Sequence, residues 1–212
     1  ALITATDKRE IITNEDIESA FFNIVMNGEK KENQSSRDKE ELKLVAWHEA
    51  GHTLVAKLLA KDEVSKVTIL ASTSGAEGVT IRTPQDRSLY SKKYIESLVK
   101  IMYAGRVAEQ LFLKSKDEIT TGASNDIKQA TALIKDYVTL YGMDDDIGLI
   151  NLSMFKTLND EMLIRKMSDI SKKLYKETED LLYNNYEKLE LIADKLLEKE
   201  SITEAELNQL LD

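Results

Sequence analysis

Apolar side chains recur every three or four positions along most of this chain, which is the period of amphipathic helices. The spacing predicts helices within five segments: 1–27, 39–60, 91–114, 125–141 and 158–199. The last segment is long enough for two helices or for one long bent helix. Thr203 and Glu206 fit a capping box, which predicts one more short helix at the end.

Each predicted helix has one apolar face that we expect to be buried. Thr13 or Asn14 can cap the first of these helices. In chain order, the inward faces consist of Ile17, Ala20, Phe21 and Ile24, then Leu44, Trp47, Gly51, Leu54 and Leu58, then Tyr94, Leu98, Ile101, Gly105, Ala108 and Phe112, and then Ile127, Ala130, Ile134, Tyr137 and Tyr141.

A second pattern occurs at residues 64–71 and 77–82, which are rich in β-branched residues and flank a turn with serine and glycine. It predicts a hairpin or a small sheet. Residues 28–38 are polar without periodicity, so we interpret them as a linker and a domain boundary. With one proline and eight glycines in 212 residues, the predicted fold is mainly α, with a small sheet near residues 64–82.

Composition narrows the class of protein. Hydrophobic residues make up 42% and charged residues 32%, and no apolar run is long enough to cross a membrane. No signal peptide is visible. The net charge of −9 argues against nucleic-acid binding, and the absence of cysteine excludes disulfides and thiolate zinc sites.

The only two histidines lie four residues apart in His48-Glu49-Ala50-Gly51-His52. This is H-E-x-x-H, a motif of zinc metalloproteases. On a helix, both imidazoles project from one face, so they can bind one metal ion, with Glu49 beside it as general base. A pair of surface histidines, or a site that binds metal without catalysis, would be the alternatives.

A catalytic zinc ion usually has three protein ligands and one position open to water. No histidine or cysteine remains, so a third ligand from this chain must be a carboxylate. Asp126 opens a predicted helix, whose N-terminus favours the ionised form that binds metal. It could also be an ordinary first-turn acid. Glu109 lies beside the apolar face of its helix and could instead pair with Arg106. The residues alone favour Asp126 and leave both candidates open.

Longer stretches around these residues resemble a known family. They are LVAWHEAGHTLVAKLL (44–59), KVTIL and GVT (within 66–80), YAGRVAEQLF (103–112), TTGASNDIKQAT (120–131), YGMDDDIG (141–148) and LLEKESITEAEL (196–207). Their order and spacing resemble the C-terminal peptidase part of FtsH-type ATP-dependent zinc proteases, which are membrane-bound. The resemblance covers nearly the whole chain. It implies Zn2+ as cofactor, with Asp126 rather than Glu109 as the third ligand beside His48 and His52.

The resemblance also implies a domain organisation: 1–27 as the C-terminal remnant of the ATPase module lid, 28–38 as a linker, and 39–212 as the zinc peptidase domain. The ATPase phosphate-binding motif and the transmembrane helices do not occur in this sequence. In the intact family protein, the resemblance implies a homo-hexamer anchored to the membrane, with the peptidase on the cytoplasmic side. This fragment itself is expected to be soluble.

Three positions depart from the family pattern. Thr53 replaces the usual alanine after the second histidine, Ala104-Gly105 replaces a double glycine, and residues 71–78 (ASTSGAEG) replace a basic stretch that contains glycine. None of them is a presumed ligand or the presumed base.

The expected reaction is metal-assisted attack of water on a peptide bond of an unfolded or membrane-derived protein. Glu49 would accept the proton from water and pass it to the leaving amine. The strand near Gly78–Thr80 could pair with an extended substrate or could simply complete the sheet. Two other functions remain open: an assembly module in which residues 158–199 make subunit contacts rather than an intramolecular bundle, and a metal-binding regulator without turnover.

Overall fold

The computed structural model describes residues 11–32, 37–60, 63–83, 88–155 and 160–211. Parts of three predicted segments lie outside these described residues, namely 1–10 of the lid remnant, 33–36 of the linker and 158–159 of the last helical segment. The elements in chain order are α2 (Asn14–Val25), α3 (Lys39–Val55), the π-helical turn η2 (Ala56–Ala60), β1 (Glu63–Thr68), β2 (Val79–Thr83), α4 (Lys92–Leu113), α5 (Ser124–Thr139), the 3-10 turn η3 (Leu152–Met154), α6 (Asp160–Tyr183), α7 (Tyr186–Lys199), β3 (Ser201–Thr203) and α8 (Glu204–Leu211).

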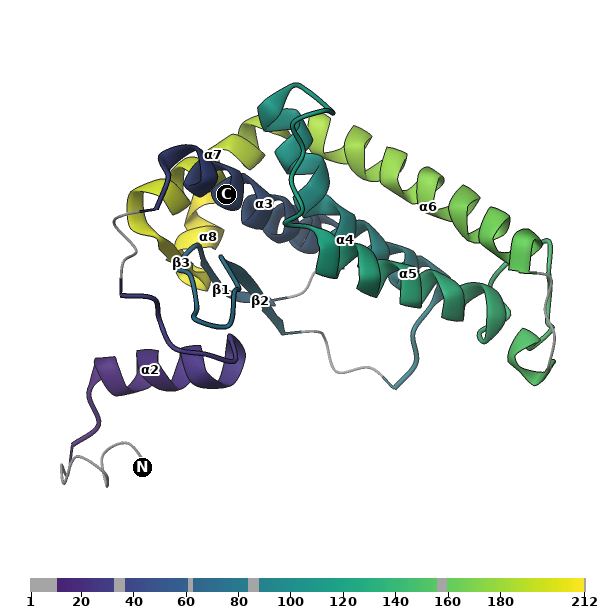
Figure 1. Ribbon diagram of the computed structural model, residues 1–212, viewed down its shortest axis with the longest axis horizontal. Coiled ribbons are helices and arrows are strands. Elements are labelled where there is room, and N and C mark those ends of the chain that lie inside the picture. The colour runs from purple at the N-terminus through teal and green to yellow at the C-terminus, as the bar shows by residue number, and fades with distance from the viewer. Residues whose placement is uncertain (1–10, 33–36, 61–62, 84–87, 156–159, 212) are drawn as a thin grey trace.

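Helices make up most of the molecule, and one small sheet lies at one end of them (Figure 1). This arrangement confirms the predicted mainly α fold. The long C-terminal segment forms two helices, α6 and α7, which end and begin on either side of Asn184 and Asn185. The final helix α8 begins at the predicted capping box, where the Thr203 N–H donates to Glu206 Oε2 at 3.0 Å.

The central contact of the fold is between α3 and α4. A Cβ atom at Gly51 of α3 would lie 2.4 Å from the Ala104 carbonyl oxygen and 2.8 Å from the Ala108 Cβ of α4. Only a residue without a side chain therefore allows the two helices to approach this closely. Gly51 thus serves close packing, and the contact brings the face of α4 that contains Gly105 and Glu109 against the histidine motif.

Apolar side chains then hold the other elements on this pair. The main core joins α3, α4, α7, α8 and the sheet, and its buried members include Trp47, Leu54, Ile101, Leu189, Ile192 and Ile202. Each such side chain contributes about 1.5–3 kcal/mol by burial. A second cluster, made of Val99, Tyr103, Ala130, Ile134 and Leu174, fixes α5 and α6 against α4. This second cluster sets the position of the α5 N-terminus, and therefore of Asp126.

The sheet has the order β2-β1-β3, and both strand pairs are antiparallel. The pairing of β1 with β2 confirms the predicted hairpin or small sheet. Val67 of the central strand β1 pairs with Thr80 of β2 on one side and with Ile202 of β3 on the other. The sequence pattern did not indicate β3, because three residues are too few to show a period. Strand β2 lies at one edge of the sheet.

Helix α2 begins at its predicted cap, since the Thr13 side chain accepts a hydrogen bond from the Asp16 N–H. The predicted inward face of this helix is partly wrong. Ile17 is 61% exposed and Ile24 is 81% exposed, whereas Phe21 is partly buried beside Phe22 and Met26, which are buried against Leu70. The helix lies on the loop after β1 and not in the main core, so only a narrow stripe of it is covered.

Three other positions that were predicted to be buried are exposed. Leu58 lies in the π-helical turn η2, whose wider spacing moves it off the α-helical face. Tyr141 follows the end of α5 at Thr139, so helical spacing no longer applies to it. Ile127 lies in the first turn of α5, and the apolar cover of this helix begins only at Ala130.

The described part of the predicted linker packs on the same loop as α2. Arg37 donates to the Ile69 carbonyl at 2.5 Å and pairs with the Glu77 carboxylate at 2.9 Å. Lys31 pairs with Glu77 at 2.6 Å. These contacts connect residues on both sides of the 33–36 gap to the loop that leads into β2. Across the described ranges, none of the helices combines the length and apolar character needed to cross a lipid bilayer.

Candidate metal centre

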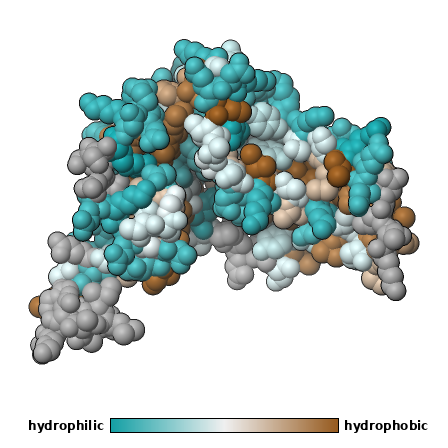
Figure 2. All heavy atoms as spheres, in the orientation of Figure 1, coloured by the Kyte–Doolittle hydropathy of each residue, from teal (hydrophilic) through white to brown (hydrophobic). Residues whose placement is uncertain are grey.

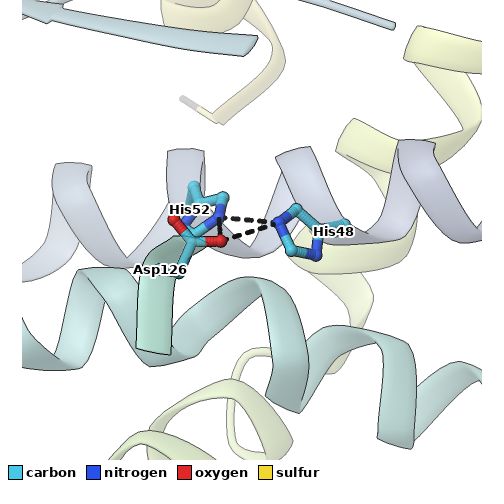
Figure 3. Close-up of side chains that lie close together, drawn as sticks. All are labelled: His48, His52 and Asp126. Atoms are coloured by element: carbon cyan, nitrogen blue, oxygen red, sulfur yellow. Dashed lines mark hydrogen bonds and ion pairs between the residues drawn. The ribbon is translucent and has the colours of Figure 1, made fainter. Parts of the chain in front are cut away.

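His48 and His52 lie one turn apart on α3, as the motif predicts. Their rings are arranged edge to face with centroids 4.6 Å apart, and their Nε2 atoms are 3.0 Å apart (Figure 3). Both side chains are mostly buried between α3 and its neighbours, with 13% and 12% of their surface exposed. The two nitrogens therefore face one common point and stay open to a small ligand.

Asp126 comes to the same point from the first turn of α5. Its Oδ2 atom lies 3.3 Å from His48 Nε2 and 3.5 Å from His52 Nε2, and Figure 3 shows the three side chains pointing toward one another. All three potential ligand atoms lie within 4.8 Å of one another. Ligands about 2.0–2.2 Å from a tetrahedral zinc ion are roughly 3.3–3.6 Å apart. The observed spacing therefore fits a single ion of this size.

Glu109, the other carboxylate that the sequence offered, lies on the opposite side of His48. Its Oε1 atom is 2.7 Å from His48 Nδ1, and its Oε2 atom accepts a hydrogen bond from the Thr120 hydroxyl at 3.1 Å. Arg106 donates to the Thr120 carbonyl at 2.5 Å, so it holds the same loop. Glu109 thus orients the His48 ring from behind, which is the common role of a carboxylate next to a metal-binding histidine.

Backbone groups of α4 complete the support of the two rings. The Ile101 carbonyl oxygen lies 2.7 Å from His52 Nδ1, which favours a proton on that nitrogen and leaves Nε2 free to bind. A Cβ atom at Gly105 would lie 2.5–2.7 Å from three atoms of the His48 ring. Gly105 therefore makes the space that His48 occupies between α3 and α4. The sequence pattern placed Gly105 on the inward face of its helix but did not indicate this contact.

The acidic surroundings change the protonation of the site. Burial lowers the pKa of His48, but hydrogen bonds to Asp126 and Glu109, together with the charges of Glu49 and Glu109, outweigh burial and raise this pKa to about 10. Burial raises the pKa of Asp126 and of Glu109, but their hydrogen bonds to the histidines outweigh it and lower both pKa values. Without metal, the centre is therefore a protonated His48 between two carboxylates, and a cation that binds there replaces that proton.

Glu49 follows His48 on α3 and is 6% exposed. Its Oε2 atom accepts a hydrogen bond of 2.6 Å from the Thr80 hydroxyl of β2. A Cβ atom at Gly78 would lie 3.0 Å from Glu49 Cγ and Oε1, so the chain before β2 also packs on this side chain. No sequence pattern indicates the Thr80 contact, because it joins a helix to a strand 31 residues later.

Comparison with known proteins identifies the family of this centre. The sequence matches the model of peptidase family M41 over residues 35–210. The chain belongs to peptidase family M41. The match to M41 includes the helix with both histidines and Glu49, the sheet, and the helix that presents Asp126.

Individual M41 relatives confirm the resemblance to FtsH-type proteases. The chain is 36% identical over 211 residues to the ATP-dependent zinc metalloprotease FtsH of Lachnoclostridium phytofermentans. It is 34% identical over 214 residues to the ATP-dependent zinc metalloprotease FtsH 1 of Alkaliphilus metalliredigens. Each alignment covers 99% of this chain but only 36% of the relative, so the chain spans about a third of the length of these relatives.

Proposed function

We propose that this chain is a zinc-dependent endopeptidase in which His48, His52 and Asp126 are the metal ligands and Glu49 is the general base. The observation that carries this proposal is the convergence of three ligand atoms from α3 and α5 on one point, in a chain of peptidase family M41. Two imidazole nitrogens and one carboxylate oxygen form a frequent protein ligand set of catalytic zinc, which leaves a fourth position open.

The residues present fit zinc. Imidazole suits this ion, and the negative charge of Asp126 offsets part of the charge of a divalent cation. When bound, zinc supplies activation of water at neutral pH and polarisation of the scissile carbonyl. The contacts of Glu109 and of the Ile101 carbonyl with the two Nδ1 atoms keep both Nε2 atoms turned toward the ion.

The proton transfers belong to Glu49. This carboxylate takes the proton of the attacking water and delivers it to the leaving amine when the peptide bond breaks. Glu49 directly follows His48 on the helix that carries both histidines, and this position supports the proposed role.

Edge strand β2 supports a polypeptide as the substrate. Within the described residues, β2 pairs only with β1, so its outer edge is available to another strand. An extended polypeptide that adds to this edge near Gly78–Thr80 would pass next to Glu49. This geometry favours unfolded or membrane-derived proteins over folded ones, because only an extended segment can pair in this way.

We also infer that the chain is the proteolytic part of a longer ATP-dependent protease. Residues 1–27 would be the remnant of the ATPase module lid, residues 28–38 the linker and residues 39–212 the peptidase domain. The start of the family match at residue 35 and the greater length of the relatives support this division. The intact protein would be a membrane-anchored homo-hexamer with its peptidase part on the cytoplasmic side.

One surface favours an assembly role as a second function. Figure 2 shows mainly hydrophilic residues on the visible face, with hydrophobic ones in scattered groups, some of them at the end opposite α2. Large apolar residues are exposed between α5 and the first turns of α6: Leu140, Tyr141, Leu149, Ile150, Met154, Phe155, Met162 and Ile164. Apolar residues exposed in one region are typical of subunit contacts, so this region is our candidate for contacts between copies.

Metal analysis combined with a cleavage assay tests the proposed peptidase. We expect about one zinc ion per chain, cleavage of an unfolded protein such as casein without ATP, loss of cleavage with a chelator, and recovery when zinc is added. The Glu49→Gln variant should retain zinc and lose cleavage. Cleavage that continues after complete metal removal, or in Glu49→Gln, would contradict the proposal.

A further inference from the structure

Thr80 of β2 engages one oxygen atom of the proposed general base. The Thr80 Oγ1 atom lies 2.6 Å from Glu49 Oε2, a length typical of a hydroxyl group that donates to a charged carboxylate. Within the described residues, Glu49 Oε1 receives no hydrogen bond. The two oxygens of this carboxylate therefore differ: Oε2 is held, and Oε1 is free to accept a proton.

Thr53 fixes the direction of that hydroxyl group. Its Oγ1 atom lies 3.3 Å from Thr80 Oγ1, and its side chain is fully buried on α3 one turn after Glu49. A threonine hydroxyl has a single proton. If Thr80 donates this proton to Glu49, its lone pairs can accept the proton of Thr53. The Glu49 carbonyl oxygen, 3.2 Å from Thr80 Oγ1, competes for the Thr80 proton, and the shorter, charged contact is the stronger one.

The sheet and the helix hold this group of three residues in place. Thr80 pairs with Val67 of β1, the central strand, so its backbone position is set by the sheet. Gly78 packs closely on Glu49, since a Cβ atom there would lie 3.0 Å from Glu49 Cγ, from Glu49 Oε1 and from the Thr68 carbonyl oxygen. The terminal torsion of a glutamate side chain is otherwise broad and weakly restrained. A fixed hydroxyl group is therefore the feature that selects one orientation of the carboxylate.

We propose that Thr80 is a positioning residue for Glu49, and that Thr53 orients the Thr80 hydroxyl group for this purpose. The pair holds Oε2 and assigns the proton-accepting role to Oε1. The inference rests on the proposed peptidase function. Without the hydroxyl group, the carboxylate samples several orientations and fewer of them suit proton transfer, so the turnover number falls while substrate binding is retained.

Matched variants test the hydroxyl group itself. Thr80→Val keeps the shape of the side chain and removes the hydroxyl, whereas Thr80→Ser keeps the hydroxyl. With a fluorogenic peptide as substrate, we expect Thr80→Val to lower kcat about 10- to 100-fold, with KM and zinc content unchanged, and Thr80→Ser to restore most of the loss. Thr53→Val should lower kcat less. Thr131→Val is the control, because its hydroxyl donates only to the Ile127 carbonyl of its own helix.

Two results of this assay would overturn the proposal. One is a Thr80→Val variant with the kcat of the unmodified protein. The other is a Thr80→Ser variant as slow as Thr80→Val, which would assign the loss to packing and not to the hydroxyl group.

A measurement without turnover tests the contact independently. In the metal-free protein, thermal unfolding of Thr80→Val, Glu49→Leu and the double variant forms a cycle, because leucine has no acceptor for the Thr80 hydroxyl group. We expect Thr80→Val to lower the Tm clearly when Glu49 is present and much less in the Glu49→Leu background. Additive Tm shifts would overturn the contact. If the zinc-loaded chain cleaves nothing, the proposed function fails, and this cycle still decides whether Thr80 holds Glu49.

Discussion

At the scale of single residues, we propose that the two carboxylates near His48 differ in role because each one faces a different nitrogen of the ring. Asp126 faces Nε2 of both histidines, at 3.3 and 3.5 Å, whereas Glu109 contacts His48 Nδ1 at 2.7 Å. A ligand contributes its own bond to the metal, whereas a residue behind a ligand contributes only orientation and basicity. Replacing the carboxylate by the corresponding amide should therefore weaken zinc binding to different extents at Asp126 and at Glu109.

Asp126→Asn is expected to weaken zinc binding more than Glu109→Gln. Loss of a residue behind a ligand typically costs about 10- to 100-fold in metal affinity, and we expect Asp126→Asn to exceed this range. Competition with a fluorescent zinc chelator measures both affinities. A Glu109→Gln protein that loses zinc while Asp126→Asn retains it would reverse the ligand assignment.

Zinc binding should release a proton from His48. In the metal-free protein its pKa is raised to about 10, so His48 is protonated at pH 7.5 and must lose that proton to bind. Lower pH favours the proton and higher pH favours zinc, so the apparent zinc affinity should rise up to about tenfold per pH unit between about pH 6.5 and 10. Calorimetric titration in buffers of different ionisation enthalpy counts the protons. Zinc binding without proton release at pH 7.5 would show that His48 is not protonated in the metal-free protein.

The same linkage predicts opposite pH trends of stability with and without metal. Because the folded pKa of His48 is raised, its contribution to metal-free stability is complete below about pH 6.5 and is lost as the pH rises toward 10. The lowered pKa of Asp126 adds stability above its ordinary pKa of 3.8, which is lost as the pH falls below that value. Zinc-loaded protein should instead gain stability between pH 6.5 and 8, since zinc affinity rises. Thermal unfolding of both forms across this range checks the signs.

At the scale of elements, local patterns predicted most helices, and contacts between distant segments explain the errors. Period and caps indicated the H-E-x-x-H helix and the start of α8, because these depend on neighbouring residues. The period left open whether residues 158–199 form one helix or two, and the structure has two. Strand β3 and the Thr80–Glu49 contact depend on chain segments that meet only after folding. The face of α2 was assigned partly wrongly because burial there depends on a single loop. The residues alone favoured Asp126 without excluding Glu109, and the resemblance to a family decided between them.

Two glycines at the contact between α3 and α4 should separate packing from metal binding. Gly51→Ala places a Cβ atom against the backbone of α4 and should destabilise the metal-free protein by about 1–3 kcal/mol. Gly105→Ala places a Cβ atom into the His48 ring, so it should reduce zinc affinity even where the fold persists. Chemical denaturation and zinc titration of both variants measure the two effects. Normal zinc affinity in Gly105→Ala would show that His48 does not need this space.

At the scale of the whole molecule, the exposed apolar residues after α5 do not include any residue of the metal centre. Phe155 belongs to these exposed apolar residues and is 57% exposed. Tyr183, at the end of α6, does not belong to them and is 70% exposed. If the exposed apolar residues after α5 form a contact between copies of the chain, a polar substitution among them should change assembly without changing the metal centre. The same change at an unrelated exposed aromatic residue should not affect assembly.

Phe155→Ser is expected to shift the protein toward smaller species in sedimentation experiments, with zinc content unchanged, because the subunit contact loses apolar area. Tyr183→Ser is the control and should sediment as the unmodified protein does. Equal sedimentation of all three proteins as oligomers would place the contact outside this region.

Anomalous diffraction at the zinc absorption edge shows directly whether one zinc ion is bound between α3 and α5. In crystals of the zinc-loaded chain, we expect a single strong anomalous peak in contact with His48 Nε2, His52 Nε2 and an oxygen of Asp126. A peak bound by Glu109 in place of Asp126, or zinc located only away from the two histidines, would contradict it.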